Sequence, residues 1–581
     1  MTSSLLMNQS DLITSINLIH GELESFKKNV DVFFLVVMGN IVFFLQAGFA
    51  FYESGSVRSK NVTNALFLNY MDTSIGSLFY LLCGYALAFG EGNGFCGTQY
   101  FALVGLPYDR MAHCFFQYTF SSTAVTIIKS SLHERCSMTA YFTSAILLSG
   151  ITYPIVSHWA WSSVGWLSQL GFRDFAGSSV VHAMGGSAGL AAALMTGPRI
   201  GRFERNGNLN HIQPHSIPQA TLGAFIFLFG AIAFNAGSNL TISKSKDGAV
   251  ISLVCLNTLI CVASATTTSL FYQRFCTASG RTIKNWNLIN MLNGSFTGMV
   301  VICAGCDQYP PWASLVVGCL GYFVFLLVFK AMQRFQIDDA TNSVSVQLGG
   351  GYFGVIGVAI FGSDGVILSP SKSSAYVLLV NIFGGAVIII FSFLSILLLY
   401  TILRHFNLHR VTAREEKIGL DLAIHNQAAY NVQDVKIDCI DSIESISRRS
   451  TAKVQPSAGS HYRLRRMTSE PHIIQAWRKC VYVYLIALLS FSYVIRGLFL
   501  MVPHKFANFS LWTMRKTPSL TSSHLTILGQ VIYRRRTLQT QEISCAVFDD
   551  GRTVLLLLLD LNLMDELPES LVEFVAVIGI L

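Results

Sequence analysis

The sequence predicts an all-α, polytopic membrane protein, and three observations lead to this prediction. Of its 581 residues, 52% are hydrophobic and only 12% are charged, whereas a soluble protein carries about 25% charged residues. The mean hydropathy is +0.50. Apolar stretches long enough to cross about 30 Å of hydrocarbon as helices recur along much of the chain. The composition and the recurring apolar stretches therefore exclude a soluble enzyme or a nucleic-acid-binding domain.

Eleven stretches satisfy the length criterion and are expected to be membrane spans. They are residues 31–51, 64–89, 111–128, 138–156, 176–197, 217–238, 247–270, 286–305, 311–332, 343–362 and 375–403. We therefore expect an N-terminal segment at 1–30 and a membrane domain at 31–403. The rest of the chain divides by composition into 404–435, a Ser/Arg-rich stretch at 436–475, which we expect to be disordered, and an unassigned extension at 476–581.

Positive charge alternates between successive loops. The loops after spans 1, 3, 5, 7 and 9 carry twelve lysines and arginines: Arg58, Lys60, Lys129, Arg135, Arg199, Arg202, Arg205, Arg274, Arg281, Lys284, Lys330 and Arg334. The opposite loops carry five: Arg110, Arg173, Lys244, Lys246 and Lys372. The positive-inside rule places the N-terminus outside the cell and the segment after the last span in the cytoplasm.

One polar pattern occurs twice inside the apolar spans. Asp174 is followed eight residues later by His182, and Asp339 is followed eight residues later by Gln347. Glycines follow at the same offsets in both places: Gly185, Gly186 and Gly189, then Gly350, Gly351 and Gly354. Eleven spans then fit a five-plus-five inverted repeat with one additional helix, whose two polar sites meet near mid-membrane. The glycines allow close helix approach there.

Several motifs resemble those of the ammonium transporter (Amt/Mep/Rh) family, Amt branch, over about residues 30–435. They occur in the expected order: Glu53-Ser-Gly-Ser-Val-Arg-Ser-Lys-Asn61, Phe116-Gln-Tyr-Thr-Phe120, Asp174-Phe-Ala-Gly-Ser-Ser-Val-Val-His182, Phe234-Asn-Ala-Gly-Ser238 and Gly419-Leu-Asp-Leu-Ala-Ile-His425. The resemblance implies a transporter of ammonium, with methylammonium as an analogue, located in the plasma membrane as a homotrimer among lipids.

The resemblance also implies roles for particular side chains. Trp161 and Phe120 would form an external aromatic cage, in which a cation over a ring face gains about 0.5–2 kcal/mol. Ser238 would accept a hydrogen bond from the cation. Phe116 and Phe234 would form a stacked gate that excludes hydrated ions. His182 would line the pore beyond that gate, where an imidazole can accept or relay a proton.

The chain departs from the family pattern in the tenth span. Members usually read Asp-Asp-Pro-x-Asp before a second pore histidine, whereas this chain reads Asp338-Asp339-Ala-Thr-Asn342 and ends in Gln347. An amide can hydrogen-bond to His182 but cannot carry a proton at neutral pH. We expect retained ammonium transport with altered proton handling. The alternative is an ammonium sensor with little flux.

Asp174 precedes the fifth span, where a carboxylate can cap the helix and act electrostatically. We expect no cofactor and no metal, because Cys303-x-x-Cys306 has no second pair. Cys96 and Cys306 fall in predicted external loops and could form a disulfide. An intramembrane hydrolase using Ser238 and His182 lacks an evident oxyanion loop, so we do not expect an enzyme.

The tail carries regulatory signals. Residues 404–435 resemble the cytoplasmic segment that contacts the neighbouring subunit in trimers of the family. Ser450, Thr468 and Ser469 lie in motifs that resemble basophilic kinase sites. Residues 480–502 are apolar enough for a further span, interrupted by Arg496. No domain is recognised in 503–581.

Overall fold

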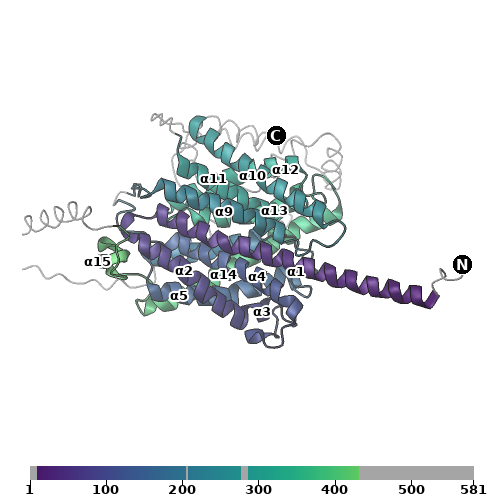
Figure 1. Cartoon of the computed structure of the whole chain (residues 1–581). Helices are drawn as coiled ribbons and strands as arrows, with labels where there is room; N and C mark the ends of the chain where they lie inside the picture. Colours follow the sequence, from purple (N-terminus) through teal and green to yellow (C-terminus); the bar gives the residue numbers. More distant parts are fainter. Residues whose placement is uncertain (1–8, 205–206, 276–285, 431–581) are drawn as a thin grey trace, which may run out of the picture. The chain divides into compact units, whose positions relative to one another are not determined.

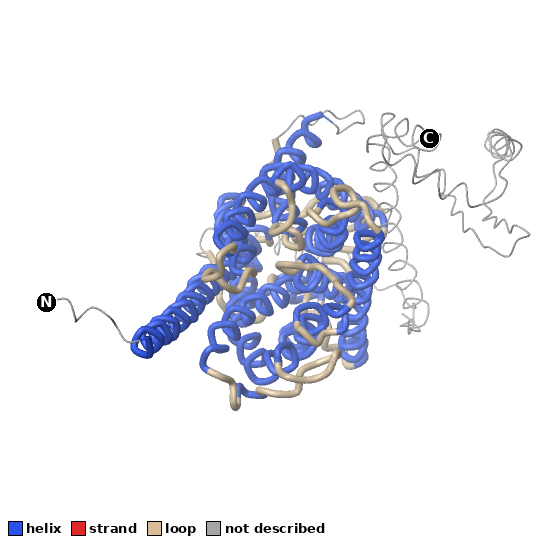
Figure 2. The backbone as a smooth tube through the Cα atoms, turned by 90° about the vertical axis from the view of Figure 1, so that its right-hand side faces the viewer, coloured by secondary structure: helices blue, strands red, loops and turns tan. Residues whose placement is uncertain are grey.

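The computed structural model describes residues 9–204, 207–275 and 286–430, all within one compact unit. These residues form helices and loops, and no β-strand occurs among them. Figure 1 shows the helices running side by side, and Figure 2 shows the same bundle turned by 90°. The all-α prediction is therefore confirmed. The expected kinase sites, the 436–475 and 476–581 segments and the 480–502 span lie outside the described residues.

The first half of the membrane domain contains eight α-helices. They are α1 (Gln9–Ser56), α2 (Val62–Phe79), α3 (Tyr85–Phe89), α4 (Met111–Leu132), α5 (Met138–Leu147), α6 (Tyr153–Trp161), α7 (Trp166–Gln169) and α8 (Met184–Thr196). Three π-helical segments continue or precede them: η2 (Tyr80–Gly84), η5 (Leu148–Thr152) and η6 (Ser178–Ala183). Short 3₁₀ turns are η1 (Ser59–Asn61), η3 (Phe101–Leu103) and η4 (Tyr108–Arg110).

The second half contains the remaining helices. They are α9 (Ile217–Gly237), α10 (Asp247–Phe275), α11 (Leu288–Ile302), α12 (Pro311–Arg334), η7 (Ser345–Gly349, π-helical), α13 (Gly350–Phe361) and α14 (Lys372–His405). Two short helices, α15 (Ala413–Ile418) and α16 (Leu420–Ala423), follow on the tail. Every one of the eleven predicted spans coincides with a helical stretch. Eight of the described stretches are long and apolar enough to cross a bilayer, and two shorter apolar ones are Leu288–Ile302 and Ser345–Phe361.

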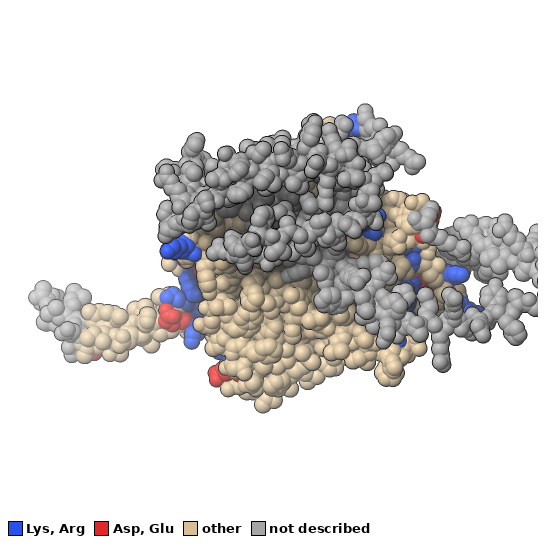
Figure 3. All heavy atoms as spheres, turned by 180° about the vertical axis from the view of Figure 1, so that it is seen from behind, with Lys and Arg blue, Asp and Glu red and all other residues tan. Residues whose placement is uncertain are grey.

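The surface visible in Figure 3 has the charge distribution of a membrane domain. Lysine, arginine, aspartate and glutamate side chains gather at the two ends of the bundle, and an uncharged belt separates them. Large apolar side chains such as Phe225, Leu379 and Leu398 are exposed along the helices. Charged side chains are costly in hydrocarbon, so such a belt is the surface expected to face lipid.

Glycines bring α1 and α9 into direct backbone contact. A Cβ atom added at Gly223 would lie 2.2 Å from the Tyr52 nitrogen, and one added at Gly55 would lie 2.5 Å from the Ala220 nitrogen. Small residues at helix interfaces permit such close approach in membranes. Figure 1 shows the two helices side by side.

Helix α1 is much longer than the predicted first span. The sequence separated an N-terminal segment at 1–30 from a span at 31–51, yet one unbroken helix runs from Gln9 to Ser56. No proline or glycine pair interrupts this stretch, and Glu24 and Lys27 form an ion pair one turn apart with a 2.8 Å separation. The predicted N-terminal segment and the predicted first span therefore share one continuous helix.

Lys129 was assigned to a cytoplasmic loop, and this assignment was wrong. It lies within α4, is almost fully buried, and places its Nζ atom 2.8 Å from an Asp72 oxygen and 3.2 Å from a Glu53 oxygen. His133 completes the cluster, with Nε2 3.2 Å from the same Glu53 oxygen. Buried charges persist when they are paired, so the polar side chains of α1 and α2 explain why this lysine is inside.

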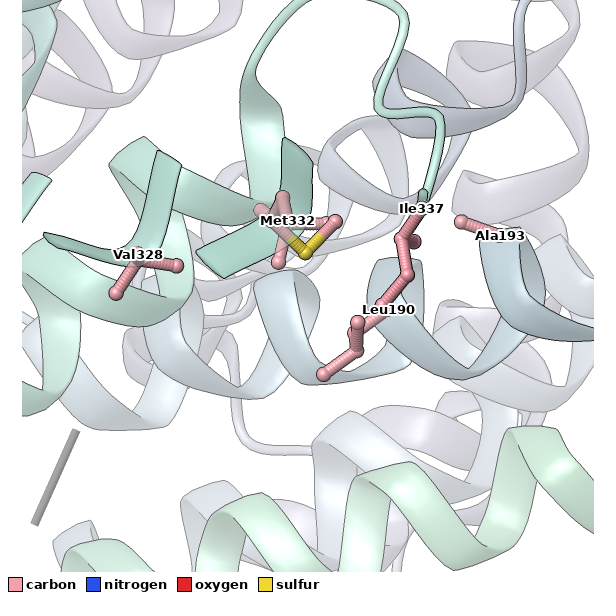
Figure 4. Packing of buried hydrophobic residues seen from close by; sticks show 6 residues of the cluster. Leu190, Ala193, Val328, Met332 and Ile337 are labelled. Atoms are coloured by element: carbon pink, nitrogen blue, oxygen red, sulfur yellow. The ribbon is translucent and has the colours of Figure 1, made fainter. Parts of the chain in front are cut away.

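A buried apolar cluster joins the two halves of the domain (Figure 4). Leu190 and Ala193 of α8 pack against Val328 and Met332 of α12, and Ile337 lies between them from the loop after α12. Val344, just before η7, belongs to the same cluster. This packing fixes the start of η7 against α8, which positions the two polar sites described next.

Candidate functional site

His182 of η6 and Gln347 of η7 meet inside the protein. His182 Nδ1 lies 2.7 Å from Gln347 Oε1, and both side chains are buried. An amide oxygen only accepts hydrogen bonds, so the ring donates through Nδ1. The opposite nitrogen, Nε2, is then the unprotonated one in a neutral imidazole. The two sites predicted from the repeated spacing are thus in direct contact.

The glycines beside the two sites pack reciprocally. A Cβ atom at Gly186 would lie 2.4 Å from the Leu348 nitrogen, and one at Gly351 would lie 2.6 Å from the Ala183 nitrogen. Each glycine is four residues after its polar residue, and each contacts the residue that follows the opposite polar residue. The close helix approach predicted from the sequence is therefore present.

Two aspartates cap the helices that carry the site. Asp174 accepts four backbone hydrogen bonds, from Gly177, Ser178, Ser179 and Val180, at 2.7–3.0 Å. The backbone turns into η6 at Gly177, whose φ of +96° is a conformation that favours glycine. Asp339 accepts two, from the Ser343 and Val344 nitrogens at 3.0 and 2.7 Å. These bonds satisfy donors that a helix start leaves unpaired. The capping expected of Asp174 is present.

Asp174 also fixes the position of Trp161. The indole Nε1 of Trp161 donates to the Asp174 backbone carbonyl oxygen at 2.7 Å. Gly177 lies under the same ring, because an added Cβ there would be 3.3 Å from a Trp161 ring carbon. The residue that caps the start of η6 therefore also orients an aromatic ring beside it.

A continuous series of rings leads from Trp161 to His182. Trp161 contacts Phe120 edge to face, with ring centroids 6.0 Å apart. Phe120 stacks on Phe234 at 3.8 Å and an interplanar angle of 15°, and Phe234 lies 5.7 Å from the His182 ring. Trp161 is partly exposed, whereas the two phenylalanines are buried. The series runs from an accessible outer ring to a closed interior.

The stacked pair differs from the one predicted. We expected Phe116 to stack on Phe234, but the ring on Phe234 is Phe120, and Phe116 is tilted against Phe120 at 4.9 Å. Phe116 packs instead against Gly237, where an added Cβ would lie 2.6 Å from its ring. Phe116 and Phe120 are one turn apart on the same face of α4, so their spacing could not distinguish them.

Ser238 ends α9 next to Phe234, and it is partly exposed. Its hydroxyl donates to the Phe234 carbonyl oxygen at 3.0 Å. Because this bond uses the only hydroxyl proton, the oxygen lone pairs stay available as acceptors. A cation that donates hydrogen bonds can use such an acceptor.

Cys303 is a neighbour of His182 that the sequence did not identify. Its Sγ lies 3.6 Å from His182 Nε2 and 3.0 Å from the Met299 carbonyl oxygen. The Cys-x-x-Cys spacing was the only signal, and it suggested packing. The disulfide considered between Cys96 and Cys306 is absent, because both cysteines are free and Cys306 is buried.

An ionic cluster lies at the end of the bundle that carries the tail. Arg199 binds Asp338 through Nε at 2.8 Å, and Arg135 donates to the Asp338 carbonyl oxygen at 2.6 Å. Burial alone would raise the pKa of the Asp338 carboxyl, but the Arg135 and Arg199 guanidinium groups outweigh it and hold this pKa well below its usual range. The cluster anchors the loop that leads into η7.

The tail docks on this end of the same chain. Glu416 of α15 accepts from the Ile200 nitrogen at 2.6 Å and pairs with Arg410 at 2.8 Å. Lys60 donates to the Glu416 carbonyl oxygen at 3.0 Å. Asp421 accepts from the Asn64 nitrogen at 2.8 Å. The segment predicted to regulate is thus bound to the loop between α1 and α2.

Residues 32–430 match the family model described as the Ammonium Transporter Family. The chain belongs to the ammonium transporter family. Amt2 of Archaeoglobus fulgidus is 33% identical over 433 residues, which cover 70% of this chain and 90% of that protein. Ammonium transporter 1 member 2 of rice (Oryza sativa subsp. japonica) is 34% identical over 413 residues, 66% of this chain and 82% of that protein.

Solved structures of the ammonium transporter family share the fold. A structure titled Sensor Amt Protein superposes with a TM-score of 0.64 at 33% identity, covering 69% of this chain and 99% of that chain. Candida albicans Mep2 superposes with a TM-score of 0.59 at 22% identity, covering 67% of this chain and 87% of that chain, which shows the fold alone. The resemblance inferred from the motifs is confirmed, and the family is one of membrane transporters.

Proposed function

We propose that this chain transports ammonium along the path lined by Trp161, Phe120, Phe234 and His182. The single observation that supports this most is the order of these rings, from a partly exposed tryptophan to a buried imidazole. Trp161 and Phe120 supply ring faces for a cation. Ser238 supplies an oxygen acceptor beside them. We assign ammonium recruitment to these three side chains.

The stacked Phe120 and Phe234 rings act as the gate in this proposal. At 3.8 Å between centroids they leave no space for a water molecule between their faces. A hydrated potassium ion cannot shed its shell against apolar rings without a large desolvation cost. Ammonium can release one proton to water on the exposed side of the rings and pass as neutral ammonia when the rings swing apart. Deprotonation therefore provides the selectivity.

Gln347 changes what happens to the proton. His182 donates its Nδ1 proton to the Gln347 oxygen, so the imidazole is held in one tautomer. The amide cannot take up that proton at neutral pH. A proton that reaches Nε2 of His182 cannot leave through residue 347. We propose that transport is retained and that fewer charges accompany each ammonium than in a transporter with two pore histidines.

The alternative function is an ammonium receptor with little flux. One neighbour of 33% identity is titled Sensor Amt Protein. In this chain the docked tail contacts the α1–α2 loop through Lys60 and Asn61 and the start of α2 through Asn64. Movement of helices around an occupied pore would reach the tail through that loop. Flux and tail movement, measured together, separate the two functions.

The assembly and location follow from the same proposal. We propose a homotrimer in the plasma membrane, with the N-terminus outside and the tail in the cytoplasm. The charge-free belt of Figure 3 would then face lipid and neighbouring subunits. Arg199, Arg202 and Lys60 lie on the tail side, as the positive-inside rule requires of a cytoplasmic face.

Growth of ammonium-uptake-deficient yeast on limiting ammonium tests retained transport. Wild type is expected to restore growth, and Phe120→Ala is expected to disturb selectivity because the gate loses one ring. His182→Ala removes the pore imidazole and is expected to reduce uptake of labelled methylammonium. Phe116→Ala is the matched control, because Phe116 lies one turn away and does not stack on Phe234. Growth with Gln347→His but none with wild type would contradict retained transport.

A further inference from the structure

The N-terminal half of α1 extends beyond the helix bundle (Figure 1). The helix has 48 residues, about 72 Å at 1.5 Å per residue, whereas crossing a bilayer takes about 20 residues. Asp11, Glu22, Glu24 and Lys28 lie in this half. Charged side chains at this density place it in water, so its apolar residues need a partner other than hydrocarbon.

Five of these apolar residues form one seam, whereas the exposed Ile13 and Leu18 lie off it. Leu12, Ile16, Ile19, Leu23 and Phe26 follow one another at intervals of four, three, four and three residues. All five are exposed, at 46–65% of their surface. Alternation of three and four is the spacing of a and d positions in a coiled coil, which keeps a seam in contact with a second helix. Val30 continues the series by another four residues.

Charge complementarity identifies the partner as another copy of this chain. With the seam at a and d, Glu22 occupies a g position and Lys27 the e position of the next heptad. In a parallel pair of identical helices, these two positions face each other across the interface. Copies of one membrane protein share their orientation, so their α1 helices are necessarily parallel. Glu22 of each copy would then meet Lys27 of its neighbour.

We propose that the N-terminal halves of α1 from neighbouring copies pack against each other as a parallel coiled coil through Leu12, Ile16, Ile19, Leu23 and Phe26. Within one copy, Lys27 pairs with Glu24, and both side chains are about half exposed. An exposed pair of this kind contributes little, about 0–1 kcal/mol. Lys27 can therefore exchange this contact for one across the interface. The proposal does not depend on what the pore carries.

Cysteine cross-linking of the full chain in membranes tests the seam. Ile19→Cys lies at a seam position, and Gly21→Cys lies on the opposite face, where an added Cβ meets no atom within 4 Å. Under mild oxidation, Ile19→Cys is expected to give several-fold more covalent dimer than Gly21→Cys, with wild type as the background. Equal yields at both positions, or no dimer from Ile19→Cys, would overturn the proposal.

A charge exchange on the Ile19→Cys chain tests the parallel register. Glu22→Lys alone and Lys27→Glu alone place like charges across the interface and are expected to lower the dimer yield. The two substitutions together restore opposite charges and are expected to restore the yield. Failure of the double variant to recover would exclude the proposed register. Ile19 and Glu22 are exposed and Lys27 is partly exposed, and an unchanged elution profile in detergent verifies that each variant is folded.

Discussion

At the scale of single residues, one aspartate links the Trp161 ring to the helix that carries His182. Asp174 caps η6 with its two carboxylate oxygens, while its backbone carbonyl holds the indole of Trp161. His182 follows on the same capped segment. One residue thus holds Trp161 and the His182 segment in place, which explains a buried carboxylate that makes no ion pair with any described residue. Its charge also favours a cation at the outer end of the path.

Replacing Asp174 is expected to reduce stability and uptake together. Asp174→Ala leaves four backbone N–H groups without acceptors, and each unsatisfied buried donor costs about 1–3 kcal/mol. Asp174→Asn retains one oxygen acceptor and is expected to lie between wild type and the alanine variant. Thermal unfolding in detergent and methylammonium uptake measure the two effects. Wild-type stability of Asp174→Ala would refute the capping role.

Lys129 neutralises two buried carboxylates, Glu53 and Asp72. Lys129→Met is expected to destabilise the protein by about 3–5 kcal/mol, because removing one partner leaves uncompensated buried charge. The exposed Lys28→Met serves as a control and should leave the unfolding temperature unchanged. Adding Asp72→Asn to Lys129→Met removes one unpaired charge and is expected to recover part of the loss. An unchanged unfolding temperature for Lys129→Met would show that the cluster is not stabilising.

At the scale of elements, two π-helical segments meet where the two halves of the domain cross. η6 and η7 each follow a capping aspartate, and the third residue after that aspartate has a positive φ, +96° at Gly177 and +60° at Asn342. π-Helical turns are rare and occur frequently at functional sites. The matching geometry and the reciprocal glycine contacts agree with the five-plus-five repeat expected from the spacing.

A substitution at Gly351 tests whether the two halves must pack this closely where they cross. Gly351→Ala would place a Cβ atom 2.3 Å from the Ser178 carbonyl oxygen, so α13 and η6 must separate. We expect a loss of about 1–3 kcal/mol from overpacking and a strong reduction of uptake, because the His182–Gln347 contact depends on the same packing. Gly248→Ala, at a position with no atom within 4 Å, is the control. Normal uptake by Gly351→Ala would contradict the account.

The docked tail is expected to depend on Gly419. This residue has φ +109°, and an added Cβ atom would lie 2.6 Å from the Lys60 Cβ. Gly419→Ala should release α15 and α16, which limited trypsin digestion would detect as faster cleavage after Arg414 and Lys417. Ile418→Ala, at an exposed neighbour, should leave cleavage unchanged. Equal cleavage rates in wild type and Gly419→Ala would show that the tail does not need this contact.

At the scale of the whole molecule, the sequence predicts the helical membrane fold and the meeting of residues 182 and 347. The long apolar stretches predict the fold, and the spacing that recurs in Asp174/His182 and Asp339/Gln347 predicts the contact. The sequence does not identify the ring that stacks on Phe234, because Phe116 and Phe120 share a helix face. It does not reveal that Lys129 is buried, because the charge of a lysine does not show whether a carboxylate lies beside it in the fold. It also does not reveal that α1 begins at Gln9, because charged residues do not mark where a helix starts. Cys303 reaches His182 only through tertiary packing.

We propose that the path conducts ammonium while Gln347 prevents the usual onward transfer of the proton. The most direct test is the ratio of charge moved to labelled methylammonium taken up, measured in oocytes for wild type and Gln347→His. We predict uptake by both proteins and a larger charge per substrate for Gln347→His, because a second imidazole can accept the proton from His182. Equal ratios, or uptake by Gln347→His alone, would contradict the claim.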